Sequence, residues 1–230
     1  MIAALLRALF ALAMPPLRRV VALGLGLSVA TFVLLWLAVS TVLYRNVFFA
    51  WRPLNWLIDL LGGLTVLALT WLLFPAVVTL LLGLFVDRVA AAVEAANYPG
   101  KPPARRQPWR ELATAALRLA MVTILLNLLA LPLYLLVPGI NCVLFLTLNG
   151  YLFSRGYFET VALRRLDAAA VGRVRRRFAG RIFLGGIAIA GLFAIPLVNL
   201  VAPVIATAFM VHVFEALPGG APHSAVRSAV

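Results

Sequence analysis

The sequence predicts an all-helical integral membrane protein, with two long transmembrane helices and two proline-broken helical hairpins that penetrate only half of the bilayer. Of its 230 residues, 64% are apolar and 12% are charged, against about 45–50% and about 25% in soluble domains. Long uncharged runs alternate with basic segments, and the formal net charge is +13. We therefore expect one membrane domain over residues 1–217, followed by a flexible tail over residues 218–230.

Residues 1–14 are expected to form an amphipathic helix on the membrane surface, because their apolar side chains cluster on one helical face. A cleaved signal peptide is the alternative, since Ala11-Leu-Ala13 resembles a cleavage site. Arg7 interrupts the apolar stretch and no cationic region precedes it, which favours the surface helix.

The first transmembrane helix is predicted over residues 20–44, which carry no charge for 25 residues. About 20 residues suffice to cross the hydrocarbon layer. Gly24 and Ser28 lie one helical turn apart and offer a face for close packing.

The second transmembrane helix is predicted over residues 57–96. Its uncharged part runs from Leu60 to Val86, and the helical pattern continues through "DRVAAAVEAA", so the helix is expected to project beyond the bilayer. The proline-rich segment "NYPGKPPARRQPW" ends it.

Two hairpins are predicted over residues 110–165 and 181–216. Their uncharged runs have 36 and 33 residues, whereas two crossings and a turn need at least about 44. Legs of about 14–16 residues would reach about 22–24 Å, so each run is expected to enter the membrane and return on the same side. For the first run a full crossing remains an alternative, because residues 119–137 are long enough to span by themselves.

Each hairpin is interrupted by proline and then asparagine, in "PGIN" and "PLVN". Proline lacks an amide donor and breaks the helix, and the asparagine amide is expected to satisfy the freed backbone groups. The alternative is a plain turn between two short helices. The predicted tip residues, which would line a path or an oligomer core, are Pro138, Gly139, Asn141, Pro196, Asn199 and Pro203.

The basic residues gather before the first helix and in segments 87–110 and 155–181. The positive-inside tendency places the termini and these segments in the cytoplasm. The stretch "RRLDAAAVGRVRRRF" resembles a nucleic-acid-binding patch, but beside a membrane run we interpret it as a topology determinant near anionic headgroups. No nucleic-acid partner is expected.

Enzyme motifs are missing from the sequence, which has no HExxH, CxxC or phosphate-binding glycine loop. We therefore expect no enzymatic activity, cofactor or metal. One motif does suggest binding: in "PPLRRV", Arg18 and Arg19 begin the first long helix. A helix N-terminus attracts anions, and guanidinium groups match oxyanions bidentately. The alternative is an ordinary pair of cations that anchors the helix.

The chain resembles the CysZ-type sulfate permease family, whose domain is shared with the etoposide-induced membrane proteins. The resemblance covers residues 10–216 and is carried by "PPLRRVV", "YLLVPGINCVLFLTLNGYLF" and "GGIAIAGLFAIPLVNLVAPVIATAFMVHVFE". It implies two long helices, two pairs of half-penetrating helices, a homo-oligomer, and sulfate uptake for cysteine synthesis. It also implies an anion site at Arg18 and Arg19 with Leu17 beside them. The chain departs from the resemblance at Pro16, where similar members often have glycine.

The expected function is therefore that of a permease for sulfate or a related oxyanion in the inner (plasma) membrane. No ATP-binding loop is present, so transport is expected to be passive or ion-coupled. A membrane scaffold or interaction protein that retains the fold without transport is the alternative.

Overall fold

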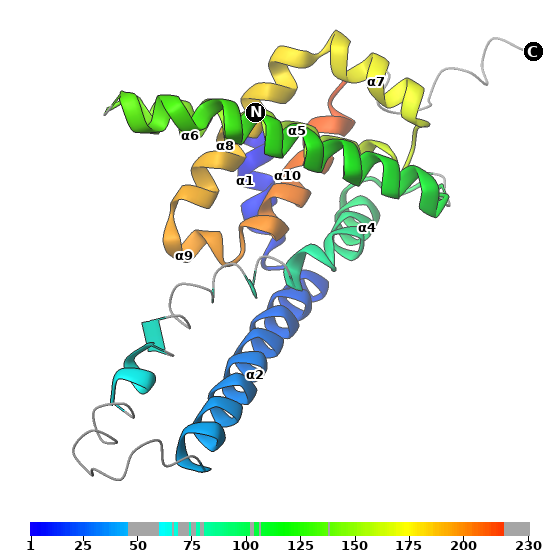
Figure 1. The fold of residues 1–230 in the computed structure, drawn as a ribbon. Coiled ribbons are helices and arrows are strands. Elements are labelled where there is room, and N and C mark those ends of the chain that lie inside the picture. Colours follow the sequence, from blue (N-terminus) through cyan, green and yellow to red (C-terminus); the bar gives the residue numbers. More distant parts are fainter. Residues whose placement is uncertain are drawn as a thin grey trace, which may run out of the picture.

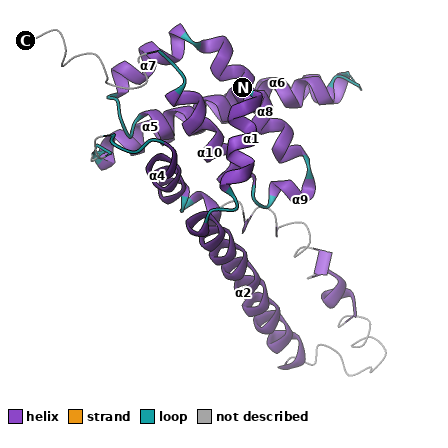
Figure 2. Cartoon of the chain, turned by 180° about the vertical axis from the view of Figure 1, so that it is seen from behind, coloured by secondary structure: helices purple, strands orange, loops and turns teal. Residues whose placement is uncertain are grey.

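The computed structural model describes residues 1–45, 60–65, 67–68, 74, 77–78, 81–101, 104–105, 107–137 and 139–218. Every regular element within these ranges is a helix, which confirms the predicted fold class (Figures 1 and 2). The helices are α1 (Ile2–Ala11), α2 (Pro15–Arg45), α4 (Val86–Asn97), α5 (Trp109–Leu136), α6 (Asn141–Ala162), α7 (Ala168–Arg177), α8 (Ala179–Ala194), α9 (Pro196–Asn199) and α10 (Ala202–Glu215).

Helix α2 extends away from the other labelled helices (Figure 1). Its start is closely packed, because a Cβ at Gly24 would clash with the side chain of Leu82. Ser28 is fully buried, and its Oγ donates a hydrogen bond to the Gly24 carbonyl oxygen at 2.8 Å. These contacts confirm the close-packing face that the sequence predicts.

The predicted helix over residues 57–96 is not continuous. Leu84 and Phe85 form a turn, and α4 begins only at Val86. Gly83 directly precedes this turn, and glycine weakens a helix. Much of the earlier part of the predicted span lies outside the described residues.

Helix α10 forms the centre of the helical core. Every residue from Ala202 to Phe214 is buried, as expected for a helix that is apolar on all sides. Helices α1, α4, α6 and α8 pack around it. One of these contacts is an edge-on pair of rings, Phe158 from α6 and Phe214, with centroids 6.0 Å apart.

Helix α1 packs against α10 through its small side chains, and Ala8 and Ala11 are fully buried. Ile2, Leu6 and Phe10 on its other side are exposed. The helix therefore joins the protein core through one face and leaves an apolar face that suits contact with lipid.

Helices α6 and α8 cross at glycines. A Cβ at Gly186 would overlap the carbonyl oxygen of Gly150 and lie 2.5 Å from the Cβ of Ser154. A Cβ at Gly150 would in turn lie 3.2 Å from the Cα of Ile187. The two backbones therefore approach so closely that only glycine fits at the crossing, as in small-residue helix pairs of membrane proteins.

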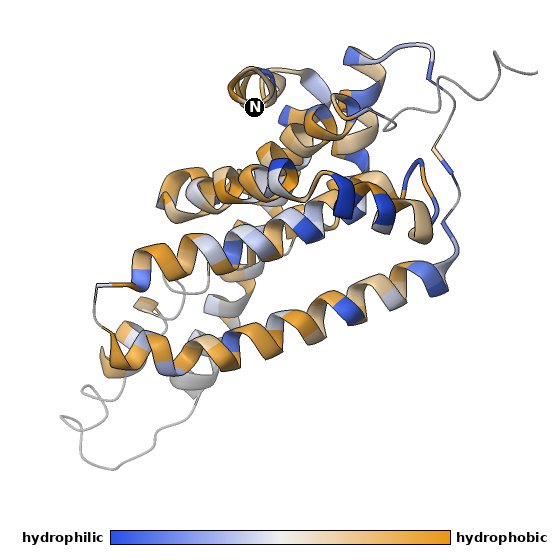
Figure 3. Cartoon of the chain, turned by 90° about the horizontal axis from the view of Figure 1, so that it is seen from above, coloured by the Kyte–Doolittle hydropathy of each residue, from blue (hydrophilic) through white to orange (hydrophobic). Residues whose placement is uncertain are grey.

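Two described helices, α2 and α5, are long and apolar enough to cross a membrane. Helix α5 has 28 residues and continues through Pro132, so the alternative of a full crossing by the first leg of the first hairpin agrees with its length. Many large apolar side chains of α5 are exposed, and the helices are predominantly orange in Figure 3. Both features suit a helix whose solvent is lipid.

The second hairpin has shorter legs. Helix α8 has 16 residues, α9 has four and α10 has 14, so neither leg reaches the length of about 20 residues that a crossing needs. Helix α8 also bends away from the arginine-rich α7 by 90°. Figure 1 shows α8 and α10 meeting through α9, the arrangement expected of a hairpin that enters and returns on one side.

A buried ion network joins α4 to the turn that follows α6. Glu94 accepts hydrogen bonds from Nε of Arg164 at 3.3 Å and from Nη2 of Arg165 at 2.6 Å. The side chains of all three residues are less than one-tenth exposed. Arg164 also pairs with Asp87, whose side chain is 73% exposed. Glu94 thus balances two buried guanidinium groups at one junction.

Candidate functional site

The two arginines predicted to hold an anion lie in the first turn of α2. Both are exposed, whereas Leu17 beside them is fully buried. Within the described residues neither guanidinium has a hydrogen-bond or ion-pair partner, and the first turn of α2 contains no acidic residue. Burial of Leu17 fixes this turn in the core and leaves Arg18 and Arg19 directed outward.

The backbone of this turn offers less to an anion than the sequence suggested. Pro15 and Pro16 have no N–H group, and the amides of Leu17 and Arg18 both donate to the Met14 carbonyl oxygen, at 3.1 and 3.0 Å. These four residues therefore offer no free backbone N–H group to an anion. Anion binding here depends on the guanidinium groups.

The predicted tip of the first hairpin is a short turn. Pro138 lies outside the described residues. Gly139 has φ = 99°, a conformation that favours glycine, and α6 begins at Asn141. The Asn141 side chain is exposed and has no hydrogen-bond partner among the described residues, so the expected satisfaction of backbone groups by its amide is not observed.

The tip of the second hairpin is more compact. Pro196 is the first residue of α9, and Pro203 is buried in the first turn of α10. The Oδ1 atom of Asn199 is buried and has no partner in the described part of the chain. In Figures 1 and 2, α9 and the junction between α5 and α6 lie at different places, so the described residues of the two tips do not form a single cluster.

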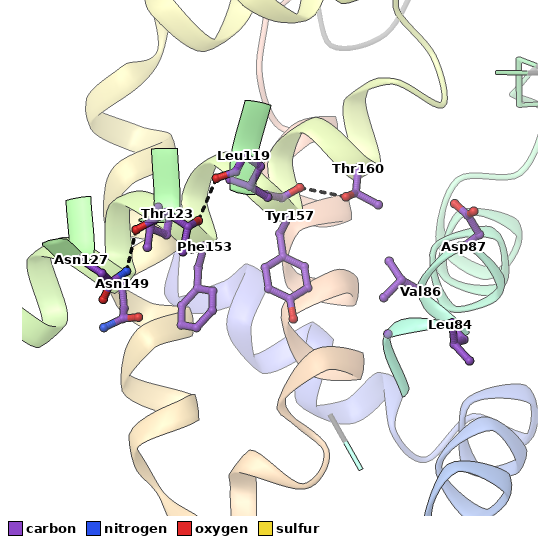
Figure 4. A pocket seen from close by; sticks show the side chains of 13 residues that line it. Leu84, Val86, Asp87, Leu119, Thr123, Asn127, Asn149, Phe153, Tyr157 and Thr160 are labelled. Atoms are coloured by element: carbon purple, nitrogen blue, oxygen red, sulfur yellow. Dashed lines mark hydrogen bonds between the residues drawn. The ribbon is translucent and has the colours of Figure 1, made fainter. Parts of the chain in front are cut away.

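A cavity of about 500 Å³, lined by both apolar and polar side chains, lies between the start of α4 and helices α5 and α6 (Figure 4). Residues at four-residue spacing on α5 form one wall, because such residues share a helical face. Asn127 and Asn149 lie toward one end of the cavity, and Asp87 lies toward the other. Its polar lining residues are Asp87, Thr123, Asn127, Asn149, Tyr157 and Thr160.

The polar side chains of this cavity bond largely within their own helices. Thr123 Oγ1 donates to the Leu119 carbonyl oxygen at 2.9 Å, and Asn149 Nδ2 donates to that of Phe145 at 3.0 Å. The cavity lining contains no arginine, lysine or histidine. Its charged lining residue is the carboxylate Asp87, so the cavity offers polar groups but no cation to an anion. Sequence reasoning missed this cavity, although the spacing of Thr123 and Asn127 was a usable signal.

The segment that follows α4 contains a partly buried cation, Lys101, close to the ion network. Burial lowers the pKa of the Lys101 ammonium below its ordinary value; Arg165 lowers it further, and Glu94 acts in the opposite direction. Lys101 pairs with Glu215 at the end of α10. The charged groups on this side of the core are therefore largely paired, in contrast to Arg18 and Arg19.

Comparison with known families gives one match. The family model described as "Sulfate transporter CysZ/Etoposide-induced protein 2.4" matches residues 4–203, which end within the first turn of α10. No curated protein and no solved structure matches the chain. The match confirms the resemblance carried by the sequence motifs and covers most of α1 and the chain onward through α9. The chain therefore belongs to the sulfate transporter CysZ/etoposide-induced protein 2.4 family.

Proposed function

We propose that this membrane protein is a permease for sulfate or a related oxyanion that feeds sulfur assimilation and cysteine synthesis. Membership of the sulfate transporter family is the observation that carries the proposal. In this proposal the protein is a homo-oligomer of the inner membrane, with its termini and basic segments in the cytoplasm. Transport is passive or ion-coupled, and no enzymatic step takes part.

Arg18 and Arg19 are the residues proposed to capture the anion. Their exposed guanidinium groups at the start of α2 lack competing carboxylate partners among the described residues. Sulfate is costly to dehydrate, so an exposed cationic pair suits its first contact with the protein. The hairpin tips, with Asn141 and Asn199, are proposed to border the onward path.

The test is uptake of radiolabelled sulfate into liposomes that contain the purified full-length protein. Replacing both Arg18 and Arg19 by glutamine is expected to reduce initial uptake about tenfold or more, because two charge-assisted contacts are lost. The matched control replaces Arg173 and Arg177, which are also exposed, by glutamine, and so removes the same net charge. This control is expected to retain uptake.

Equal loss in both double variants would mean that general charge, rather than Arg18 and Arg19, controls uptake. No uptake by the unmodified protein, under either an anion gradient or an imposed pH or sodium gradient, would contradict the permease and favour the membrane scaffold.

A further inference from the structure

A second cavity lies beside the arginine-rich segment that precedes α8, and the proposed anion path does not use it. It has a volume of about 470 Å³ and is bounded by α6, the end of α7 and the start of α8. Three arginines line it: Arg155 from α6, and Arg175 and Arg176 from α7. The sequence alone suggested only that these residues set the membrane topology.

Arg155 is the unusual member of this group. It is only 4% exposed, and its Nη2 atom is buried without a hydrogen-bond partner in the described part of the chain. A buried guanidinium N–H group without an acceptor is costly. Because Arg155 lines the cavity, a ligand with acceptor oxygens is the partner that would offset this cost.

The charge balance also favours an anion. Glu159 is the carboxylate paired with these arginines. Its Oε1 atom accepts hydrogen bonds from Nε of Arg155 at 3.2 Å and from Nη1 of Arg175 at 2.7 Å. Arg176 is exposed at the cavity. Three guanidinium groups therefore face one carboxylate, which leaves a local excess of positive charge.

The backbone at the start of α8 also favours a bound anion. Ala179 and Gly180, in the first turn of the 16-residue helix α8, line the cavity, and the first turn of a helix presents N–H groups without intrahelical acceptors. We propose that this cavity is a second oxyanion site, which binds a tetrahedral sulfate or phosphate group through Arg155, Arg175 and Arg176. Such a phosphate group occurs both as the free inorganic ion and in the headgroups of phospholipids.

The site is tested on the purified full-length protein in which Arg18 and Arg19 are both glutamine. Any anion binding that remains cannot come from the start of α2, so the result does not depend on the transport proposal. Equilibrium binding of radiolabelled phosphate and of radiolabelled sulfate is measured in one arm. Binding of dihexanoyl phosphatidylglycerol is measured by native mass spectrometry in the other.

In the protein that lacks Arg18 and Arg19, one of these probes is expected to bind. Arg176→Gln is expected to weaken the binding of that probe about fivefold, and Arg155→Lys about tenfold. Arg173→Gln removes the same charge from the same helix but does not line the cavity, and is expected to change binding by less than about twofold. Arg176 and Arg173 are both exposed, so these two variants should fold normally even if Arg155→Lys does not.

A response by the free ions alone identifies a soluble oxyanion, whereas a response by the lipid alone identifies a headgroup phosphate. Either result supports the site. Binding of neither class of probe, or equal weakening by Arg176→Gln and Arg173→Gln, would overturn it.

Discussion

Replacing Gly186 by alanine is expected to lower the free energy of unfolding by about 3 kcal/mol or more, at the upper end of the cost of overpacking a well-packed core. The added Cβ would overlap the Gly150 carbonyl oxygen and lie 2.8 Å from the backbone nitrogen of Ser154. These neighbours are backbone atoms that no side-chain rotation can move, so α6 and α8 would have to separate. Since α8 also packs against α10, displacing α8 would also disturb its contact with the buried α10.

The matched control is Gly191→Ala in the same helix. A Cβ at Gly191 has no neighbour within 4 Å, and alanine is a better helix former than glycine by about 1 kcal/mol. The control should therefore be neutral or slightly stabilising. Both variants are compared in detergent by following the loss of the monodisperse size-exclusion peak on heating. Equal midpoints for Gly186→Ala and Gly191→Ala would show that the crossing is not closely packed.

Replacing Glu94 by alanine is expected to destabilise the fold by about 3–5 kcal/mol, the usual cost of removing one partner of a buried ion pair. The change leaves the buried guanidinium groups of Arg164 and Arg165 without the carboxylate that bonds both. Glu94→Gln retains most of the side-chain volume but removes the charge. It is expected to cause most of the same loss, which would assign the effect to charge rather than to packing.

Asp87→Ala is the control for this network. Asp87 also pairs with Arg164, but its side chain is 73% exposed, so solvent screens the pair and the expected cost is below about 1 kcal/mol. The same heating assay compares the three variants. If Glu94→Ala is no more destabilising than Asp87→Ala, the junction between α4 and α6 does not depend on the buried ion pairs.

Uncharged run lengths and helix breakers predicted much of the fold. The turn between α5 and α6 falls at the expected "PGIN" break, and Pro196 begins the short α9. Proline alone was not sufficient as a guide, since Pro132 lies inside α5. The difference has a physical basis: the described part of the first break includes Gly139 at positive φ, a conformation that cannot continue a right-handed helix.

The candidate anion residues could be predicted only in part. The sequence placed Arg18 and Arg19 at a helix start. Only the structure shows that the amides of Leu17 and Arg18 already donate to the Met14 carbonyl oxygen. Nothing local distinguishes Arg155 from the other arginines of its segment. Its burial depends on the packing of α6 against α8 and on the position of α7, and both are tertiary properties.

The transport proposal depends on a second hairpin that enters the membrane and leaves it on the same side. The most direct measurement uses single cysteines, after the native Cys142 has been replaced by alanine. Arg177→Cys and Pro218→Cys report the two ends of the hairpin, and Leu197→Cys reports its tip, where the native side chain is 82% exposed. A membrane-impermeant maleimide is applied to sealed cells and to inside-out vesicles.

Both end cysteines are expected to react from the cytoplasmic side, and the tip cysteine is expected not to react from the outer side. Helices α8 and α10, with 16 and 14 residues, are too short to place the tip cysteine on the far side of the bilayer. Reaction of Leu197→Cys from the outer side, at the rate of an exposed loop cysteine, would mean that both legs cross the whole bilayer. That result would contradict the half-penetrating hairpin and the path built on it.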